Sequence, residues 1–412
     1  MAAQPAAEAK VYLHIGEPKT GTTFIQQAMW RNRVELAAQG VVLPGHHPQD
    51  HYRASQDLRG LEKLPTDPAG SWTGEWEVLA SEAQQAGKTA VISHELFSAA
   101  DAAQAGRAVQ SLQPAEVHIV LTVRDIATLL PAEWQETVKH RNTRSWEDWL
   151  GDVIDRESVD ADRRQWWFWR VHDTLAILRL WAEHVPPERI HVITAAPRGS
   201  PSGLLWERFA SVLGIDPDSA DLSRARPNAS LGMAETEFLR RLNQALPGRD
   251  EIPDWFYMWN VKETVAHRAL AGRPGGTRLV LPADRDAWAK EQSETLIAGL
   301  RDSGYDVVGD LDDLRPPQAT EPAASPSDQP AERMLDAAVQ TAAALVINQY
   351  RRQYRPARPR EPRGRGLAGR IEAAISESPR LKRAVRDYSS RYPAVRRLRV
   401  LVWRARERTR KH

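Results

Sequence analysis

The N-terminal half of the chain alternates short apolar runs with segments whose apolar residues recur every three or four positions. The runs are rich in β-branched residues and predict strands at KVYLHI (10–15), TAVIS (89–93), VHIVLTV (117–123) and IHVIT (190–194). Helical spacing follows the first run and recurs over 101–112, 125–140, 172–184 and 202–213. This alternation is typical of an α/β fold with a mainly parallel sheet between two layers of helices.

The C-terminal part has a different organisation. Two more segments with helical spacing, 234–246 and 284–303, are expected to complete the α/β domain. The chain then becomes rich in Pro, Ala, Ser and Asp, a composition that predicts a linker. Arg, Pro and Gly dominate the end of the chain, which we expect to be partly disordered or helical. The predicted parts are a flexible N-terminus (1–9), an α/β domain (10–310), a linker (311–331), a helix (332–354) and a basic tail (355–412).

The composition is that of a globular protein, with 27% charged and 42% hydrophobic residues in a chain of 412. No run reaches the roughly 18 to 20 apolar residues that span a bilayer. The N-terminus, MAAQPAAEAK, lacks the basic and apolar regions of a signal peptide. Without cysteine, disulfides, thiolate metal sites and catalytic thiols are excluded. We therefore expect a cytoplasmic protein.

The net charge of +2 conceals a strong asymmetry along the chain. Residues 351–412 contain 21 basic and 5 acidic side chains, whereas residues 1–350 contain 35 basic and 49 acidic ones. The protein is thus an acidic body with a basic tail. Such a tail is attracted to anionic surfaces, and AVRRLRVLVWRARERTR (394–410) has the composition of an interfacial helix. We expect it to hold the protein at the inner face of an anionic membrane. Nucleic acid is a less favoured partner, because no base-reading module accompanies the charges.

The stretch GEPKTGTT (16–23) follows the first predicted strand and resembles a phosphate-binding loop. In the common nucleotide loop, G-x-x-x-x-G-K-[ST], the lysine follows the second glycine. Here Thr22 occupies that position and the lysine lies inside the loop. A glycine-rich loop before a helix binds anions through converging backbone N–H groups and the positive helix N-terminus. The candidate ligands of an anion are Gly16, Lys19, Thr20, Gly21, Thr22 and Thr23.

Two further groups follow predicted strands and are expected to face the same cleft as the loop. His94 and Glu95 come directly after TAVIS, and Arg124 ends VHIVLTV. Ligands bind at the carboxyl ends of the strands in parallel sheets. Each residue also has an ordinary structural interpretation, because Arg124 could pair with Asp125 and Glu95 could begin a helix. His14, inside the first strand, is interpreted as a packed histidine.

At these residues the chain resembles the sulfotransferases, which use 3′-phosphoadenosine 5′-phosphosulfate (PAPS) as donor and share a P-loop-like three-layer α/β/α fold. HIGEPKTGTT is similar to their 5′-phosphosulfate loop, and VHIVLTVRD to their 3′-phosphate motif. The resemblance covers about residues 10 to 245 and is strongest to bacterial, actinobacterial members. It implies that Lys19 stabilises the leaving phosphate, that Arg124 binds the 3′-phosphate, and that no metal is needed.

The resemblance also implies a base near VISHELFSA, where many members place Ser-x-Glu or His. Glu95 or His94 would take the acceptor's proton. One feature departs from the family, which has a 3′-phosphate-binding serine seven or eight residues after the arginine. Pro131 and Ala132 occupy those positions here. The replacements that we consider are Thr128 or a later loop with Asn228 and Ser230.

The expected reaction is sulfuryl transfer to a hydroxyl acceptor, a glycan, a glycolipid or a small metabolite. Three clustered tryptophans, Trp166, Trp167 and Trp169, could stack on sugars, although packing is the simpler interpretation. Two other functions remain open from the residues. One is a P-loop kinase or NTPase, which would require Mg²⁺. The other is a non-catalytic, degenerate nucleotide-binding protein that its basic tail recruits to a surface.

Overall fold

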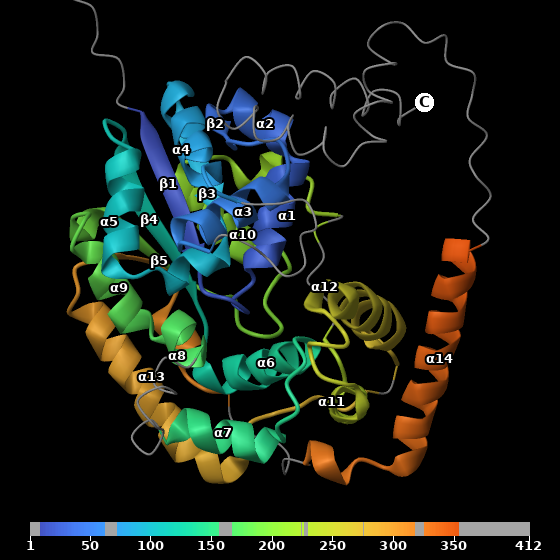
Figure 1. The fold of residues 1–412 in the computed structure, drawn as a ribbon. Coiled ribbons are helices and arrows are strands. Elements are labelled where there is room, and N and C mark those ends of the chain that lie inside the picture. Colours follow the sequence, from blue (N-terminus) through green and yellow to red (C-terminus); the bar gives the residue numbers. More distant parts are fainter. Residues whose placement is uncertain are drawn as a thin grey trace, which may run out of the picture.

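The computed structural model describes residues 9–61, 72–155, 167–223, 225, 230–274, 276–317 and 325–353. A six-stranded, all-parallel sheet forms its centre, in the order β2-β3-β1-β4-β5-β6 (Figure 1). The strands are β1 Lys10–Gly16, β2 Val41–Val42, β3 Thr89–Ser93, β4 Glu116–Val123, β5 Ile190–Thr194 and β6 Asp306–Val308. The predicted α/β class and parallel sheet are therefore confirmed, and the four predicted strands lie where expected.

Both faces of the sheet are covered, which explains why its strands read as continuous apolar runs. Val11, Leu13 and Ile15 of β1 face one core, and Tyr12 packs into the other. Helices α1 (Thr22–Arg31), α2 (Arg33–Ala38) and α10 (Leu204–Leu213) cover the Tyr12 face. The opposite face is covered by α3 (Pro48–Leu58), α4 (Glu75–Gln85), α5 (Ala102–Ser111), α9 (Thr174–Ala182) and α13 (Asp286–Arg301).

A third core is built mainly from helices and lies below the sheet in Figure 1. Its buried residues include Trp134, Trp146 and Trp149, so packing accounts for much of the tryptophan. Trp169 belongs to it as well, and its indole donates to the Val153 carbonyl at 3.0 Å. Its helices are α6 (Ile126–Lys139), α7 (Trp146–Ile154), α8 (Trp167–His172), α11 (Met233–Ala245), α12 (Asp254–Tyr257), the π-helix η4 (Met258–Leu270), α14 (Ala331–Gln353) and the start of α13.

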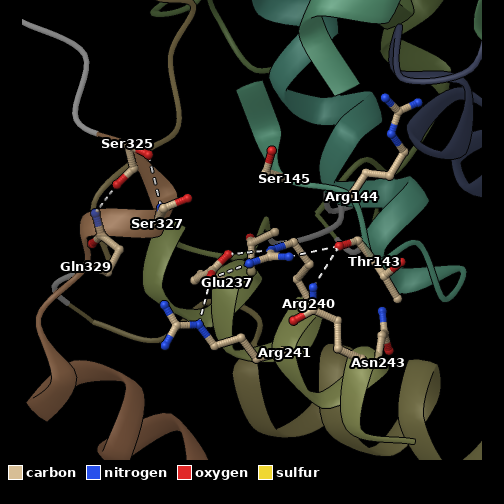
Figure 2. A network of polar contacts seen from close by, with 12 residues as sticks. Thr143, Arg144, Ser145, Glu237, Arg240, Arg241, Asn243, Ser325, Ser327 and Gln329 are labelled. Carbon is tan, nitrogen blue, oxygen red and sulfur yellow. Dashed lines mark hydrogen bonds and ion pairs between the residues drawn. The ribbon is translucent and has the colours of Figure 1, made fainter. Parts of the chain in front are cut away.

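Polar contacts fix α11 against the C-terminal end of α6 and the loop that follows it. Figure 2 shows the buried Glu237 carboxylate between Arg240 and Arg241. Two nitrogens of Arg240 and one of Arg241 each lie 2.7 Å from a carboxylate oxygen. Arg240 also donates to the Thr143 carbonyl at 2.8 Å, as Figure 2 shows. Asn243 donates to the Val138 carbonyl at 2.8 Å. The C-terminal end of α6 is therefore held in place by another helix, which matters for the side chains described below.

The predicted helix near residue 332 is present as α14, whereas β2 and β6, two and three residues long, carry no recognisable pattern. The remaining elements are short 3₁₀ turns: η1 (Glu95–Ala99), η2 (Pro187–Arg189), η3 (Pro217–Ser219), η5 (Ala283–Arg285), η6 (Leu311–Leu314) and η7 (Pro326–Asp328). The basic tail, Trp166 and Asn228 lie outside the described residues. No helix in the described part of the chain is both long and apolar enough to cross a membrane.

Candidate functional site

The loop after β1 lies at the point where the order in which the chain adds strands to the sheet reverses. β3 lies on one side of β1 and β4 on the other, so the carboxyl ends of three strands meet there. Gly16 has φ +102°, and a Cβ on it would lie 2.7 Å from the Glu95 Cα. Gly21 has φ +100°, and its Cβ would meet the Leu205 side chain at 2.4 Å. Both loop glycines are therefore required by conformation and by close approach.

The loop exposes a run of backbone donors. Among the described residues, the five consecutive N–H groups from Lys19 to Thr23 have no hydrogen-bond acceptor. The Thr20 hydroxyl is turned inward, because it donates to the Glu17 carbonyl and contacts the Thr122 hydroxyl, both at 2.6 Å. Thr22 and Thr23 begin α1, where helical N–H groups have no partner within the helix. This arrangement suits an anion that accepts several N–H groups at once.

Lys19 connects the loop to two other elements. Its backbone is left-handed, with φ +62°, and its carbonyl accepts a hydrogen bond from Arg124 Nη1 at 2.9 Å. Its ammonium lies 2.5 Å from Glu136 Oε2 on α6, and 26% of the side chain is exposed. The predicted loop lysine and the predicted strand-end arginine therefore lie together, whereas the contact with Glu136 has no counterpart in the sequence pattern.

The guanidinium of Arg124 lies among other charges that the sequence reasoning missed. Burial lowers the pKa of Arg124, and the positive charge of Arg278 lowers it further. The negative charge of the neighbouring Asp125 acts in the opposite direction and raises it. Burial and the charge of Arg198 likewise lower the pKa of Arg278. Arg278 is therefore close enough to act electrostatically on Arg124, and Arg198 on Arg278. Thr128 donates its backbone N–H to Asp125 at 2.8 Å, in an N-terminal cap of α6.

His94 and Glu95 lie directly beside the loop, on the β3 side. The His94 Nδ1 accepts the Leu96 N–H at 3.2 Å, and burial lowers the pKa of His94, so its remaining proton is on Nε2. Gln26 donates to Glu95 Oε2 at 2.9 Å. Burial alone would raise the pKa of Glu95, but His94 and Gln26 lower it below its usual value. Glu95 is therefore an ionised carboxylate that accepts a hydrogen bond from the Gln26 side chain.

A buried ionic group supports the loop from beneath. Glu17 accepts from the Thr174 hydroxyl at 2.5 Å and lies 3.3 Å from His172 Nδ1. The other ring nitrogen of His172 lies 3.7 Å from Glu133 of α6. His14, predicted to be a packed histidine, is buried, hydrogen-bonds Ser93 at 2.8 Å, and has its pKa lowered by burial to about 4.

Comparisons with known proteins add little to this geometry. No protein-family model and no curated protein matches the chain. Among solved structures, the chain is similar to a crystal structure of a sulfotransferase from Alicyclobacillus acidocaldarius, with 16% identity and a TM-score of 0.34. That match covers 55% of this chain and 87% of the other. A TM-score this low supports no assignment by itself, so the function has to be argued from the residues of the site.

Proposed function

We propose that this protein is a sulfotransferase that moves a sulfuryl group from PAPS to a hydroxyl acceptor. The observation that carries the proposal is the loop itself. It combines five free N–H groups with an internal lysine and a neighbouring strand-end arginine. The loop with its lysine and the neighbouring arginine form two separate positively charged groups. A nucleotide with anionic groups at two separated positions fits this arrangement. The lysine inside the loop, in place of one after Gly21, distinguishes it from the loop of a kinase or NTPase.

Two groups of residues would hold the donor. The amides of residues 19–23 and the hydroxyls of Thr22 and Thr23 would take the 5′-phosphosulfate. Arg124 would bind the 3′-phosphate, and Arg278 and Arg198 would supply the charge that the missing serine does not. The Thr128 backbone amide is already occupied by Asp125, which makes the arginines the better replacement.

The reaction would be an in-line displacement at sulfur. The acceptor oxygen forms a bond to sulfur, and the bond between sulfur and the phosphate oxygen breaks. Lys19 would neutralise the negative charge that develops on that leaving oxygen. Glu95 would take the acceptor's proton, since it is ionised and lies beside the loop. His94 is the weaker candidate because its Nδ1 lone pair already accepts the Leu96 N–H.

Calorimetric titration with adenosine 3′,5′-bisphosphate tests the proposal directly. We expect micromolar binding without Mg²⁺, weakened at least about tenfold in Arg124→Ala, because a hydrogen-bonded charge contributes about 1.5–3 kcal/mol. Lys290→Gln, at an exposed position of α13, is the matched control and should bind like the native chain. Binding of Mg-ATP in place of the bisphosphate would favour a kinase or NTPase. Binding of neither nucleotide would leave a non-catalytic protein.

We also propose that the basic tail places the enzyme at an anionic membrane surface, on the cytoplasmic side. Residues 351–412 carry 21 basic and 5 acidic side chains, and each Lys or Arg near such a surface is worth roughly 1 kcal/mol. The acceptor would then be a hydroxyl compound available at that surface, such as a glycolipid.

A further inference from the structure

Three lysines from three different elements converge on one carboxylate beside the loop. The ammonium groups of Lys19 and Lys139 lie 2.5 Å and 3.3 Å from Glu136 Oε2. The ammonium of Lys262, on η4, lies 2.7 Å from Oε1, and His140 Nε2 lies 3.2 Å from the same oxygen. Within the described residues, Glu136 is the one carboxylate that pairs with any of the three lysines. The cluster therefore contains two more positive charges than negative ones.

Water cannot fully compensate these charges. The side chain of Lys139 is 7% exposed and that of Lys262 is 17% exposed. Burial lowers the pKa of Lys139, although Glu136 opposes the shift. Burial would raise the pKa of Glu136, but His140 and the three lysines hold it well below its usual range. One lysine would be enough to neutralise Glu136, so the other two are a cost to the fold unless a further anion compensates them.

The position of the cluster relates it to the reaction. The Lys19 carbonyl accepts a hydrogen bond from Arg124, and the Lys19 ammonium pairs with Glu136. Lys19 therefore connects the arginines to the lysine cluster. Glu136 lies ten residues after the start of α6, about 15 Å along the helix axis. The arginines would hold the nucleotide, and Lys19 would contact the leaving oxygen. Lys262 and Lys139 pair with the same carboxylate as Lys19, so they lie close to the place where the transferred group would be.

We propose that Lys139 and Lys262 bind an anionic group of the acceptor, a carboxylate or a sulfate ester, and so select acidic hydroxyl compounds. This inference rests on the proposed sulfotransferase function. When the sulfuryl donor binds, the Lys19 ammonium leaves Glu136 and contacts the donor. The Glu136 carboxylate then neutralises the charge of one of the two remaining lysines. The excess positive charge of the other lysine is then satisfied by the acceptor. His140, 2.5 Å from the Lys262 ammonium and half exposed, places this pair at the solvent side of the cluster.

A matched pair of sugars tests the inference. The full chain is saturated with adenosine 3′,5′-bisphosphate and titrated by calorimetry with p-nitrophenyl β-D-glucuronide or p-nitrophenyl β-D-glucoside. The two sugars share their ring hydroxyls and differ at C6, which is a carboxylate in the glucuronide and a hydroxymethyl group in the glucoside. We expect the glucuronide to bind about tenfold more tightly, the lower end of what one hydrogen bond to a charged group contributes.

Variants of Lys262 identify the group responsible. Lys262→Gln should lower glucuronide affinity to that of the glucoside, and Lys262→Arg should retain most of the preference because it keeps the charge. Lys290→Gln, on the exposed side of α13, should retain the full preference. Bisphosphate affinity is measured for every variant, so that only nucleotide-saturated, folded protein is compared.

Each remaining outcome overturns a defined statement. Equal affinities for the two sugars, or no binding of either to the nucleotide complex, would overturn the acidic-acceptor inference and leave the proposed function standing. A preference that survives in Lys262→Gln would overturn the role of the lysines. Failure of the bisphosphate itself to bind would instead overturn the proposed function, and this inference with it.

Discussion

The buried His172 makes the stability of the protein depend on pH in a defined direction. Its ring is fully buried between Glu17 of the loop and Glu133 of α6, at 3.3 Å and 3.7 Å. Burial alone would lower the pKa of His172, but the two carboxylates raise it to about 9. In the unfolded chain the pKa of a histidine is about 6.5. The folded state therefore holds the proton more tightly than the unfolded state.

The sign and size of the effect follow from this difference. The stabilisation is fully present below about pH 6.5, where both states are protonated, and is lost as the pH rises through about 9. A difference of roughly 2.5 pKa units corresponds to on the order of 3 kcal/mol of unfolding free energy. Because the ring is fully buried, solvent screening does not reduce this value appreciably.

Urea unfolding followed by tryptophan fluorescence measures the effect. Native protein and His172→Gln are compared at pH 6, 7.5 and 9.5, and the difference in unfolding free energy should shrink by about 3 kcal/mol across the series. His184→Gln, which removes a histidine whose Nε2 hydrogen-bonds the Ala102 carbonyl near the surface, controls for general pH effects. A difference between native and His172→Gln that stays constant with pH would refute the reasoning.

Three further predictions concern the loop, the arginines and the tail. Lys19→Ala should lower kcat by about 10²–10³-fold and change bisphosphate affinity much less, because the contact of Lys19 with the leaving oxygen strengthens in the transition state. A mutational effect confined to KM would contradict this role. Arg278→Ala should weaken adenosine 3′,5′-bisphosphate about tenfold and adenosine 5′-phosphate little, by calorimetry; equal losses would place Arg278 elsewhere. Removing residues 351–412 should abolish co-sedimentation with anionic vesicles, and unchanged sedimentation would exclude the membrane role.

The elements that the sequence predicted well are those whose pattern is local. The strands β3 and β5 lie over the residues of their apolar runs, and β1 and β4 differ by one residue. Burial on both faces leaves no solvent-facing positions, so these runs stay mainly apolar, and their few polar residues, such as His14, His118 and His191, are themselves buried. The loop was recognisable for a similar reason, because the conformations of Gly16 and Gly21 exclude other residues and fix the spacing.

The residues that sequence reasoning missed act across large separations in the chain. Glu136 and Lys139 look like an ordinary i, i+3 pair on a helix surface, which is a common and weak interaction. Nothing local indicates that Lys19 and Lys262 arrive at the same carboxylate from 117 and 126 residues away. Arg278 follows an irregular segment without periodicity, so its proximity to Arg124 depends on the tertiary fold alone.

The lysine cluster also explains how the loop lysine could change partners at low cost. When a donor takes Lys19, a carboxylate paired only with that lysine would be left buried and unpaired, which typically costs 3–5 kcal/mol. Here Glu136 would keep Lys262, Lys139 and His140 at 2.7, 3.3 and 3.2 Å. Lys19 is therefore paired with Glu136, but Glu136 stays compensated by other positive charges when Lys19 moves away. For this reason we expect the positive charge beside the transferred group to be movable, whereas the backbone amides of the loop are fixed by Gly16 and Gly21.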